Sequence, residues 1–128
     1  MDYNESLSIY YDNIKKLDEI NNNYAISLGE DNYLTKLSKT FYKSLNEFIK
    51  FIDIMEDKEE YLASLLEFSY DCIELYDSMS LDVINEKHTF KRKRLLKKSY
   101  EKNKESINKI LDRMDLISNM IDSAIKKI

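Results

Sequence analysis

Apolar residues recur every three or four positions through almost the whole chain, which is the spacing of one face of an α-helix. We expect a first helix from Asn4 to Leu28. Its apolar positions are Leu7, Tyr10, Ile14, Leu17, Tyr24 and Leu28. Asp2 and Glu5 have the spacing of a capping box, and Gly29 stands where a residue in the left-handed conformation would end the helix. Both ends of this helix are therefore predicted.

The same spacing continues after Gly29 and predicts a second helix over residues 31–56. Its apolar positions are Leu34, Leu37, Phe41, Leu45, Phe48, Ile52 and Met55. A charged run follows, in which Asp57 and Glu60 again have capping-box spacing, so we expect a third helix from there to Ser78. Its apolar positions are Tyr61, Leu65, Phe68, Cys72, Leu75 and Met79. One uninterrupted helix is the alternative, because the charged residues between the two segments are good helix formers.

The last third of the chain has the most regular pattern. Its apolar register is Leu96, Tyr100, Asn103, Ile107, Ile110, Met114, Ile117, Ile121, Ala124 and Ile128. No residue in 82–127 forces a stop, so one helix of about 45 residues, roughly 65–70 Å long, is allowed. The alternative is a break near Thr89. A first turn of Lys and Arg opposes the helix dipole, whereas Asp82 and Glu86 suit it, so we expect the early start.

Composition supports an all-α fold. The chain has no Pro and one Gly, whereas sheets and irregular loops normally need more of both for their turns. We predict an antiparallel bundle of three or four long amphipathic helices, forming a single domain over residues 1–128. The C-terminal helix should be the longest and should overhang the others. Tyrosines at apolar positions are expected in the core, with their hydroxyls reaching its rim.

The net charge of −4 hides an asymmetry along the chain. Residues 1–80 contain 7 Lys and 17 Asp or Glu, a balance of −10, whereas residues 81–128 contain 13 Lys or Arg and 7 acids, a balance of +6. Residues 87–104 alone hold nine basic residues and one acid. Such asymmetry favours an anionic partner, or an attraction between parts of the protein itself.

Five of these cations fall on one side of the predicted fourth helix. At 100° per residue they lie within about 80° of arc, along roughly 22 Å of helix. This basic stripe comprises Lys87, Lys91, Arg94, Lys98 and Lys102. Leu96 and Tyr100 lie on the opposite side, so the stripe should face away from the bundle.

The basic stripe has three interpretations. It is a solvated helix face, or it meets the acidic part of the same chain or of a symmetry mate, or it binds an anionic partner. Nucleic-acid phosphate, lipid headgroups and an acidic protein surface are the candidate partners. Five such contacts suffice for salt-sensitive binding without sequence specificity, and no sequence-reading motif is present.

The apolar face of the last helix is unusually wide near the C-terminus, at about 180° where a single neighbour needs about 100°. It should pack into a groove between other helices, which is the interpretation we favour, or against a partner chain or second copy. The residues that would form this partner or self-association face are Ile117, Met120, Ile121 and Ile125.

Few residues offer catalytic or metal-binding chemistry. His88, the only histidine, lies in a polar segment and should be solvated, and Cys72, the only cysteine, lies on an apolar stripe and should be buried. One Gly is too few for a phosphate-binding loop. We therefore expect no enzyme activity, metal, cofactor or small-molecule substrate. No apolar run approaches the roughly 18 residues of a membrane span, so a cytoplasmic protein is expected.

The function that these features favour is a non-enzymatic helical interaction module, an adaptor or regulator, that binds a partner macromolecule through helical surfaces. A protein partner is expected, and a homo-oligomer fits as well. The alternative is binding of nucleic acid or an anionic membrane through the basic stripe. Retention on a polyanion at two salt concentrations would separate the two.

Overall fold

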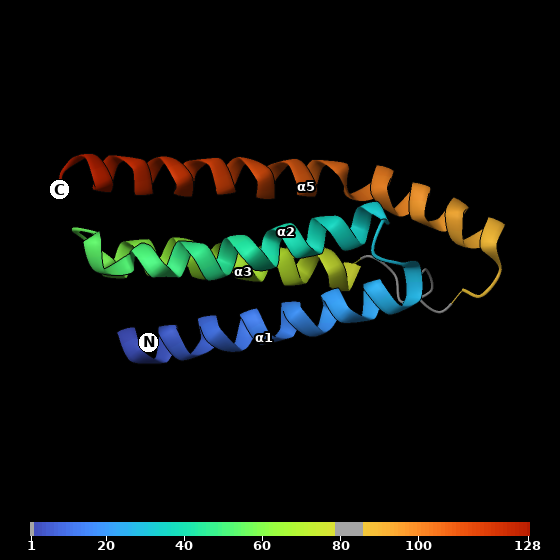
Figure 1. Ribbon diagram of the computed structural model, residues 1–128, viewed down its shortest axis with the longest axis horizontal. Coiled ribbons are helices and arrows are strands. Elements are labelled where there is room, and N and C mark those ends of the chain that lie inside the picture. Colours follow the sequence, from blue (N-terminus) through green and yellow to red (C-terminus); the bar gives the residue numbers. More distant parts are fainter. Residues whose placement is uncertain (1, 79–85) are drawn as a thin grey trace.

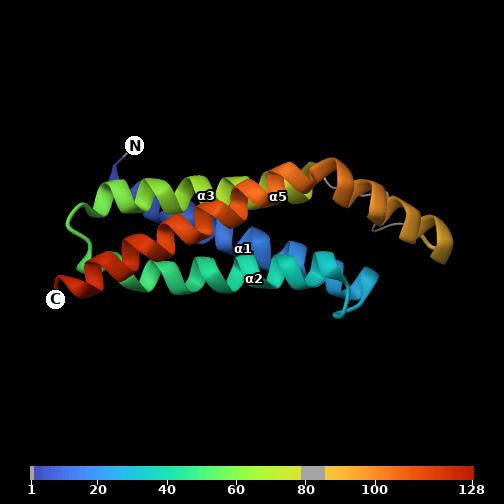
Figure 2. The same cartoon turned by 90° about the horizontal axis from the view of Figure 1, so that it is seen from above.

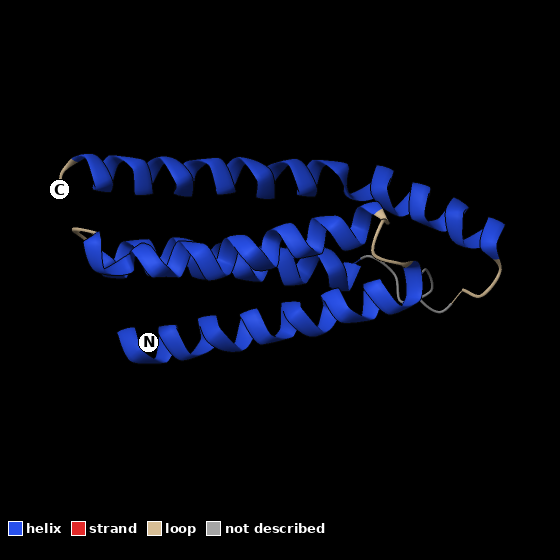
Figure 3. Ribbon diagram, viewed as in Figure 1, coloured by secondary structure: helices blue, strands red, loops and turns tan. Residues whose placement is uncertain are grey.

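A computed structural model describes residues 2–78 and 86–128, and 89% of these residues are helical, with no strand among them. The elements are α1 (Tyr3–Leu28), α2 (Tyr33–Phe48), the 3₁₀-helix η1 (Ile49–Ile54), α3 (Lys58–Ser78) and α5 (Thr89–Lys126). Figure 3 shows how little of the described chain lies outside helices. The predicted all-α fold is confirmed.

The four α-helices of the described residues pack as an elongated bundle with an up-down-up-down path. Figure 1 shows α2 and α3 in the middle, with α1 on one side of them and α5 on the other, and α1 and α5 each contact both middle helices. The longest helix is α5, with 38 residues. Its N-terminal part extends beyond the ends of the other helices (Figures 1 and 2), as the sequence predicts.

The first helix begins and ends where the sequence predicts. The Asp2 carboxylate accepts a hydrogen bond from the backbone N–H of Glu5 at 2.8 Å, which satisfies one of the four free N–H groups of the first turn. Gly29 follows the last helical residue with φ 87° and ψ 159°. The positive φ confirms the need for glycine, but the ψ value lies outside the left-handed helical region that we expected.

The second and third helices are separate. The chain leaves η1 at Met55, whose extended backbone (φ −77°, ψ 137°) breaks the helix. The N–H of Glu60 then donates to the Asp57 carboxylate at 3.0 Å, as the capping-box spacing predicts. The alternative of one uninterrupted helix is wrong. The predicted second helix, over residues 31–56, is shorter and changes form, because it is α-helical over Tyr33–Phe48 and 3₁₀ over Ile49–Ile54. A 3₁₀ turn is frequent at helix C-termini, but a run of six residues is unusually long.

Buried tyrosine hydroxyls stabilise this α-to-3₁₀ transition. Tyr10 of α1 donates to the Leu45 carbonyl, and Tyr61 of α3 donates to the Phe48 carbonyl, each at 2.6 Å. The hydroxyls therefore do not reach the rim of the core as expected, since both tyrosines are at most 1% exposed. A buried hydroxyl needs a partner, and carbonyls near the irregular end of a helix can supply one.

The core runs along all four helices and contains a few paired polar groups. Asn21, which interrupts the apolar stripe of α1, accepts a hydrogen bond from the Ser38 hydroxyl at 2.8 Å. The Asn13 amide donates to the Ser69 hydroxyl at 2.9 Å and so links α1 to α3. Cys72 is fully buried, as predicted, and burial raises the pKa of its thiol well above its usual value.

The fourth predicted helix begins later than expected. Its first helical residue is Thr89, preceded by His88 in an extended conformation, so the predicted early start is wrong for the described residues 86–88. Asp82 lies outside the described residues. No acid stands in the first turn of α5. The dipole term on which we relied is worth only about 0.3–1 kcal/mol at an exposed helix end, too little to decide where the helix begins.

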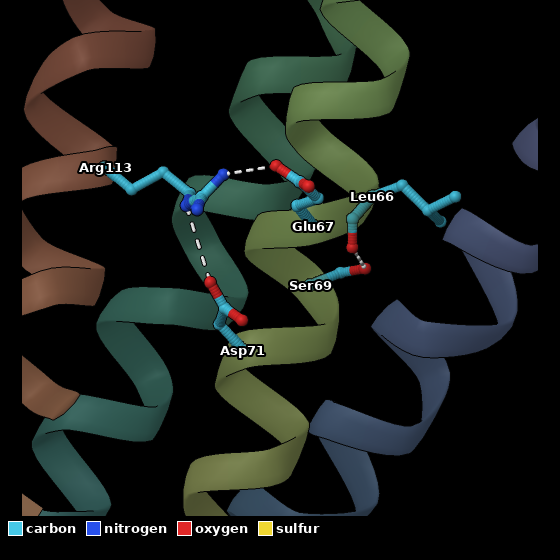
Figure 4. A network of polar contacts seen from close by, with 5 residues as sticks. All are labelled: Leu66, Glu67, Ser69, Asp71 and Arg113. Carbon is cyan, nitrogen blue, oxygen red and sulfur yellow. Dashed lines mark hydrogen bonds and ion pairs between the residues drawn. The ribbon is translucent and has the colours of Figure 1, made fainter.

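An ion-pair network joins the middle of α5 to α3. The Arg113 guanidinium lies 2.7 Å from a Glu67 oxygen and 3.4 Å from an Asp71 oxygen, while the Ser69 hydroxyl donates to the Leu66 carbonyl at 2.7 Å (Figure 4). The pKa of Asp71 is raised, because burial outweighs the opposing effect of the Arg113 charge. The network is partly exposed, so its contribution to stability is small.

Candidate functional site

The N-terminal part of α5 carries most of the basic stripe, and its first turns extend beyond the bundle. All five stripe side chains are exposed. Four of them lie on α5, whereas Lys87 precedes the helix and so does not belong to a continuous helical stripe. We call residues 87–98 the basic arm, which contains seven Lys or Arg and no acid. The structure thus places the stripe residues on one accessible surface, of which only the first part projects beyond the bundle.

The charges of the basic stripe are not neutralised by the described part of the chain. None of the ion pairs within residues 2–78 and 86–128 involves a stripe side chain. The neighbouring acid Glu86 accepts a hydrogen bond from the backbone N–H of His88 at 3.0 Å instead. The positive end of the α5 dipole adds to the same field. The described acidic part of the same chain therefore does not occupy the stripe.

The arm is attached to the bundle by an aromatic contact that the sequence pattern does not reveal. The rings of Tyr33, at the start of α2, and Tyr100 of α5 meet edge to face with centroids 5.2 Å apart. Leu96 also packs against the core, so the face of α5 opposite the stripe points inward as predicted. Burial and the neighbouring Tyr100 raise the pKa of Tyr33. Tyr33 lies outside every predicted apolar stripe, and no local signal marks it.

The proposed partner face at the C-terminus divides into two parts. Ile117 and Ile121 are only 1% and 6% exposed because they pack into the bundle core, so they are not available to a partner in this structure. Met120 is half-buried at the surface, and Ile125 is 46% exposed. Most of the wide apolar face of α5 thus packs into the groove between α2 and α3. The outer edge of this face is exposed to solvent.

A groove of about 680 Å³ opens beside this outer edge, at the end of the bundle remote from the arm. It lies between the connection from η1 to α3 and the end of α5. Its apolar lining includes Ile54, Leu116 and Met120, and its rim carries acids. The acids of the rim are Glu56, Asp57 and Glu60, and the Lys127 ammonium of the same groove lies 3.8 Å from the Glu56 carboxylate.

Other candidate chemistry is sparse in the described residues. His88 is exposed, and no group of three His, Cys, Asp or Glu side chains in residues 2–78 and 86–128 could hold a metal ion. No helix in this described part of the chain is both long and apolar enough to cross a membrane.

Neither the protein-family models, the curated proteins nor the solved structures gave a match to this chain.

Proposed function

We propose that this protein is a non-enzymatic interaction module whose basic arm binds a macromolecule with an anionic surface. The observation that supports this most strongly is the arm itself. The stripe cations are exposed, the first of them on the part of the arm that extends beyond the bundle, and no described carboxylate pairs with them. Like charges at helical i,i+4 spacing repel one another by a few tenths of a kcal/mol, and an external anion would relieve that repulsion.

Nucleic-acid phosphate suits the arm better than a membrane. A helix that inserts into a bilayer surface needs a continuous apolar face. In this arm Leu96 packs against the protein's own core, and Phe90 is the large apolar side chain that stands exposed, at 76%. Binding through phosphates alone would be sensitive to salt and indifferent to sequence.

The triple charge reversal Lys91→Glu, Arg94→Glu and Lys98→Glu tests this proposal through retention on heparin at two salt concentrations. We expect at least a tenfold loss of affinity, because the variant loses several contacts to anionic groups. The melting temperature should stay the same or rise slightly, because repulsion between like charges on the helix is removed. A matched control reverses three exposed lysines of α1 and α2, Lys15, Lys16 and Lys43.

The outcomes separate the three interpretations of the stripe. Loss of retention in the arm variant alone supports the proposal. A drop in melting temperature or in oligomer size would instead show that the stripe pairs with acids of this protein. Equal retention of the arm variant and the control would overturn the proposal. The basic stripe would then be a solvated helix face.

A second candidate is self-association through the C-terminal groove. Leu116 is 64% exposed and Ile54 is 37% exposed at this groove. The acidic rim complements the basic arm of a second copy, which lies at the opposite end of the molecule. Salt-sensitive sedimentation as a dimer, lost on Leu116→Glu, would support this candidate, and a monomer at every salt concentration would exclude it.

A further inference from the structure

An aromatic pocket lies where the basic arm joins the bundle. It has a volume of about 320 Å³ and is lined by Asn32, Tyr33, Leu34, Leu96, Lys97 and Tyr100. Tyr33 is 49% exposed, so a large part of its ring faces solvent although the ring edge contacts Tyr100. The volume is near the lower end of the range for small-ligand pockets and is sufficient for one nucleobase.

Three cations lie between two aromatic rings on the side of the arm that leads away from this pocket. At 100° per residue, one sector of about 120° contains Tyr100, Lys93, Lys97, Phe90 and Arg94. It extends over roughly 15 Å of helix. Lys93, Lys97, Phe90 and Arg94 are all exposed. With Tyr33 added from α2, three rings and three cations form one surface that the sequence alone does not assemble.

We propose that this surface binds single-stranded nucleic acid, with a base in the Tyr33–Tyr100 pocket and phosphates on Lys93, Lys97 and Arg94. This inference rests on the proposed function and specifies its ligand. Proteins that bind single strands combine a basic track with aromatic rings on which bases stack. In a duplex the base faces are already stacked on one another, so the rings would have nothing to contact. The arrangement therefore favours single strands over duplexes.

Ring and charge make separable contributions to such binding. Heparin offers anionic groups but no bases, so it measures the arm charges alone. An oligothymidylate of about ten nucleotides offers both. Removing the Tyr33 ring should weaken oligothymidylate binding and leave heparin binding unchanged. Removing the charges should weaken both.

The experiment compares the wild type with Tyr33→Leu by fluorescence anisotropy on oligothymidylate, on a duplex of equal length and on heparin. We expect Tyr33→Leu to lose about five- to a hundredfold in affinity for oligothymidylate, the usual effect of removing one stacking ring. Tyr33→Phe, which keeps the ring, should bind as the wild type does. Tyr70→Leu is the matched control, because Tyr70 is similarly exposed, at 46%, and lies on α3.

A second variant guards against a folding defect in Tyr33→Leu. Phe90 is exposed on the overhanging part of the arm, so Phe90→Ser should keep the helix content and melting temperature while also weakening oligothymidylate binding.

Three results would overturn the inference. The first is an unchanged oligothymidylate affinity in both ring variants. The second is a duplex that binds as tightly as the single strand. The third is binding to anionic lipid vesicles without binding to oligothymidylate, which would point to a membrane. If the wild type binds heparin in any of these cases, the proposed function stands and only the single-stranded ligand is excluded. If the wild type binds neither heparin nor oligothymidylate, the proposed function and this inference are both wrong.

Discussion

Four tyrosine side chains show how single residues organise this core. Tyr10, Tyr24, Tyr61 and Tyr76 are at most 5% exposed, and three of them donate hydrogen bonds to carbonyls of α2. The apolar spacing placed the rings of Tyr10, Tyr24 and Tyr61 in the core correctly. It did not show where the hydroxyls go, because their acceptors are backbone carbonyls from 13 to 42 residues away in sequence.

The buried tyrosines predict a loss of stability in alkali. Burial raises the pKa of all four hydroxyls, that of Tyr24 to about 12, because the folded protein disfavours the charged phenolate. The stabilisation is complete below the unfolded tyrosine pKa of about 10. As pH rises from there towards 12, the unfolded chain ionises first, and each such tyrosine costs about 1.4 kcal/mol per pH unit.

Phenolate absorbance and helical circular dichroism, followed together through this pH range, would check the prediction. We expect the buried tyrosines to ionise only as helix is lost. Ionisation of all ten tyrosines of the chain with the helix content intact would contradict it.

At the scale of elements, α5 behaves as a core helix along its C-terminal two thirds. Substitutions there test the division between core and surface on one helix. Ile117→Asp and Ile121→Asp should each destabilise the fold by several kcal/mol, because each buries an unpaired charge. Ile125→Asp is the matched control, since this side chain is 46% exposed and should cost far less.

Chemical denaturation of the three variants gives the comparison directly. Equal losses in all three, or none at Ile117 and Ile121, would contradict the described packing of α5. A folded Ile121→Asp protein that changes only its oligomeric state would show that this position lies at an interface.

Local interactions made part of the fold predictable from sequence. The caps at Asp2 and Asp57 join residues three apart, so their spacing alone predicted two helix starts correctly. The start of α5 was predicted wrongly, because the interaction of charged side chains with the helix dipole is too weak to decide where a helix begins. For the candidate site, the sequence predicted the exposed stripe cations. It could not predict the pocket, because Tyr33 and Tyr100 meet only through the packing of α2 against α5.

At the scale of the whole molecule, the charge asymmetry becomes a spatial one. The basic residues project from one end of the elongated bundle, and the acidic rim of the C-terminal groove lies at the other (Figure 1). A positive projection on a net negative protein can reach a polyanion while the rest of the molecule is repelled from it. We therefore propose that the arm, and not the protein's overall charge, mediates binding.

The salt dependence of binding to a single-stranded oligonucleotide tests this central claim most directly. The logarithm of the affinity should fall linearly with the logarithm of salt concentration, with a slope of about −0.7 for each phosphate neutralised. Lys93→Gln, Arg94→Gln and Lys97→Gln together should reduce the steepness of this slope by about two, because these three side chains are the proposed phosphate contacts. Neutralising Lys15, Lys16 and Lys43 in the same way should leave it unchanged. Equal slopes for the two triple variants would contradict the account.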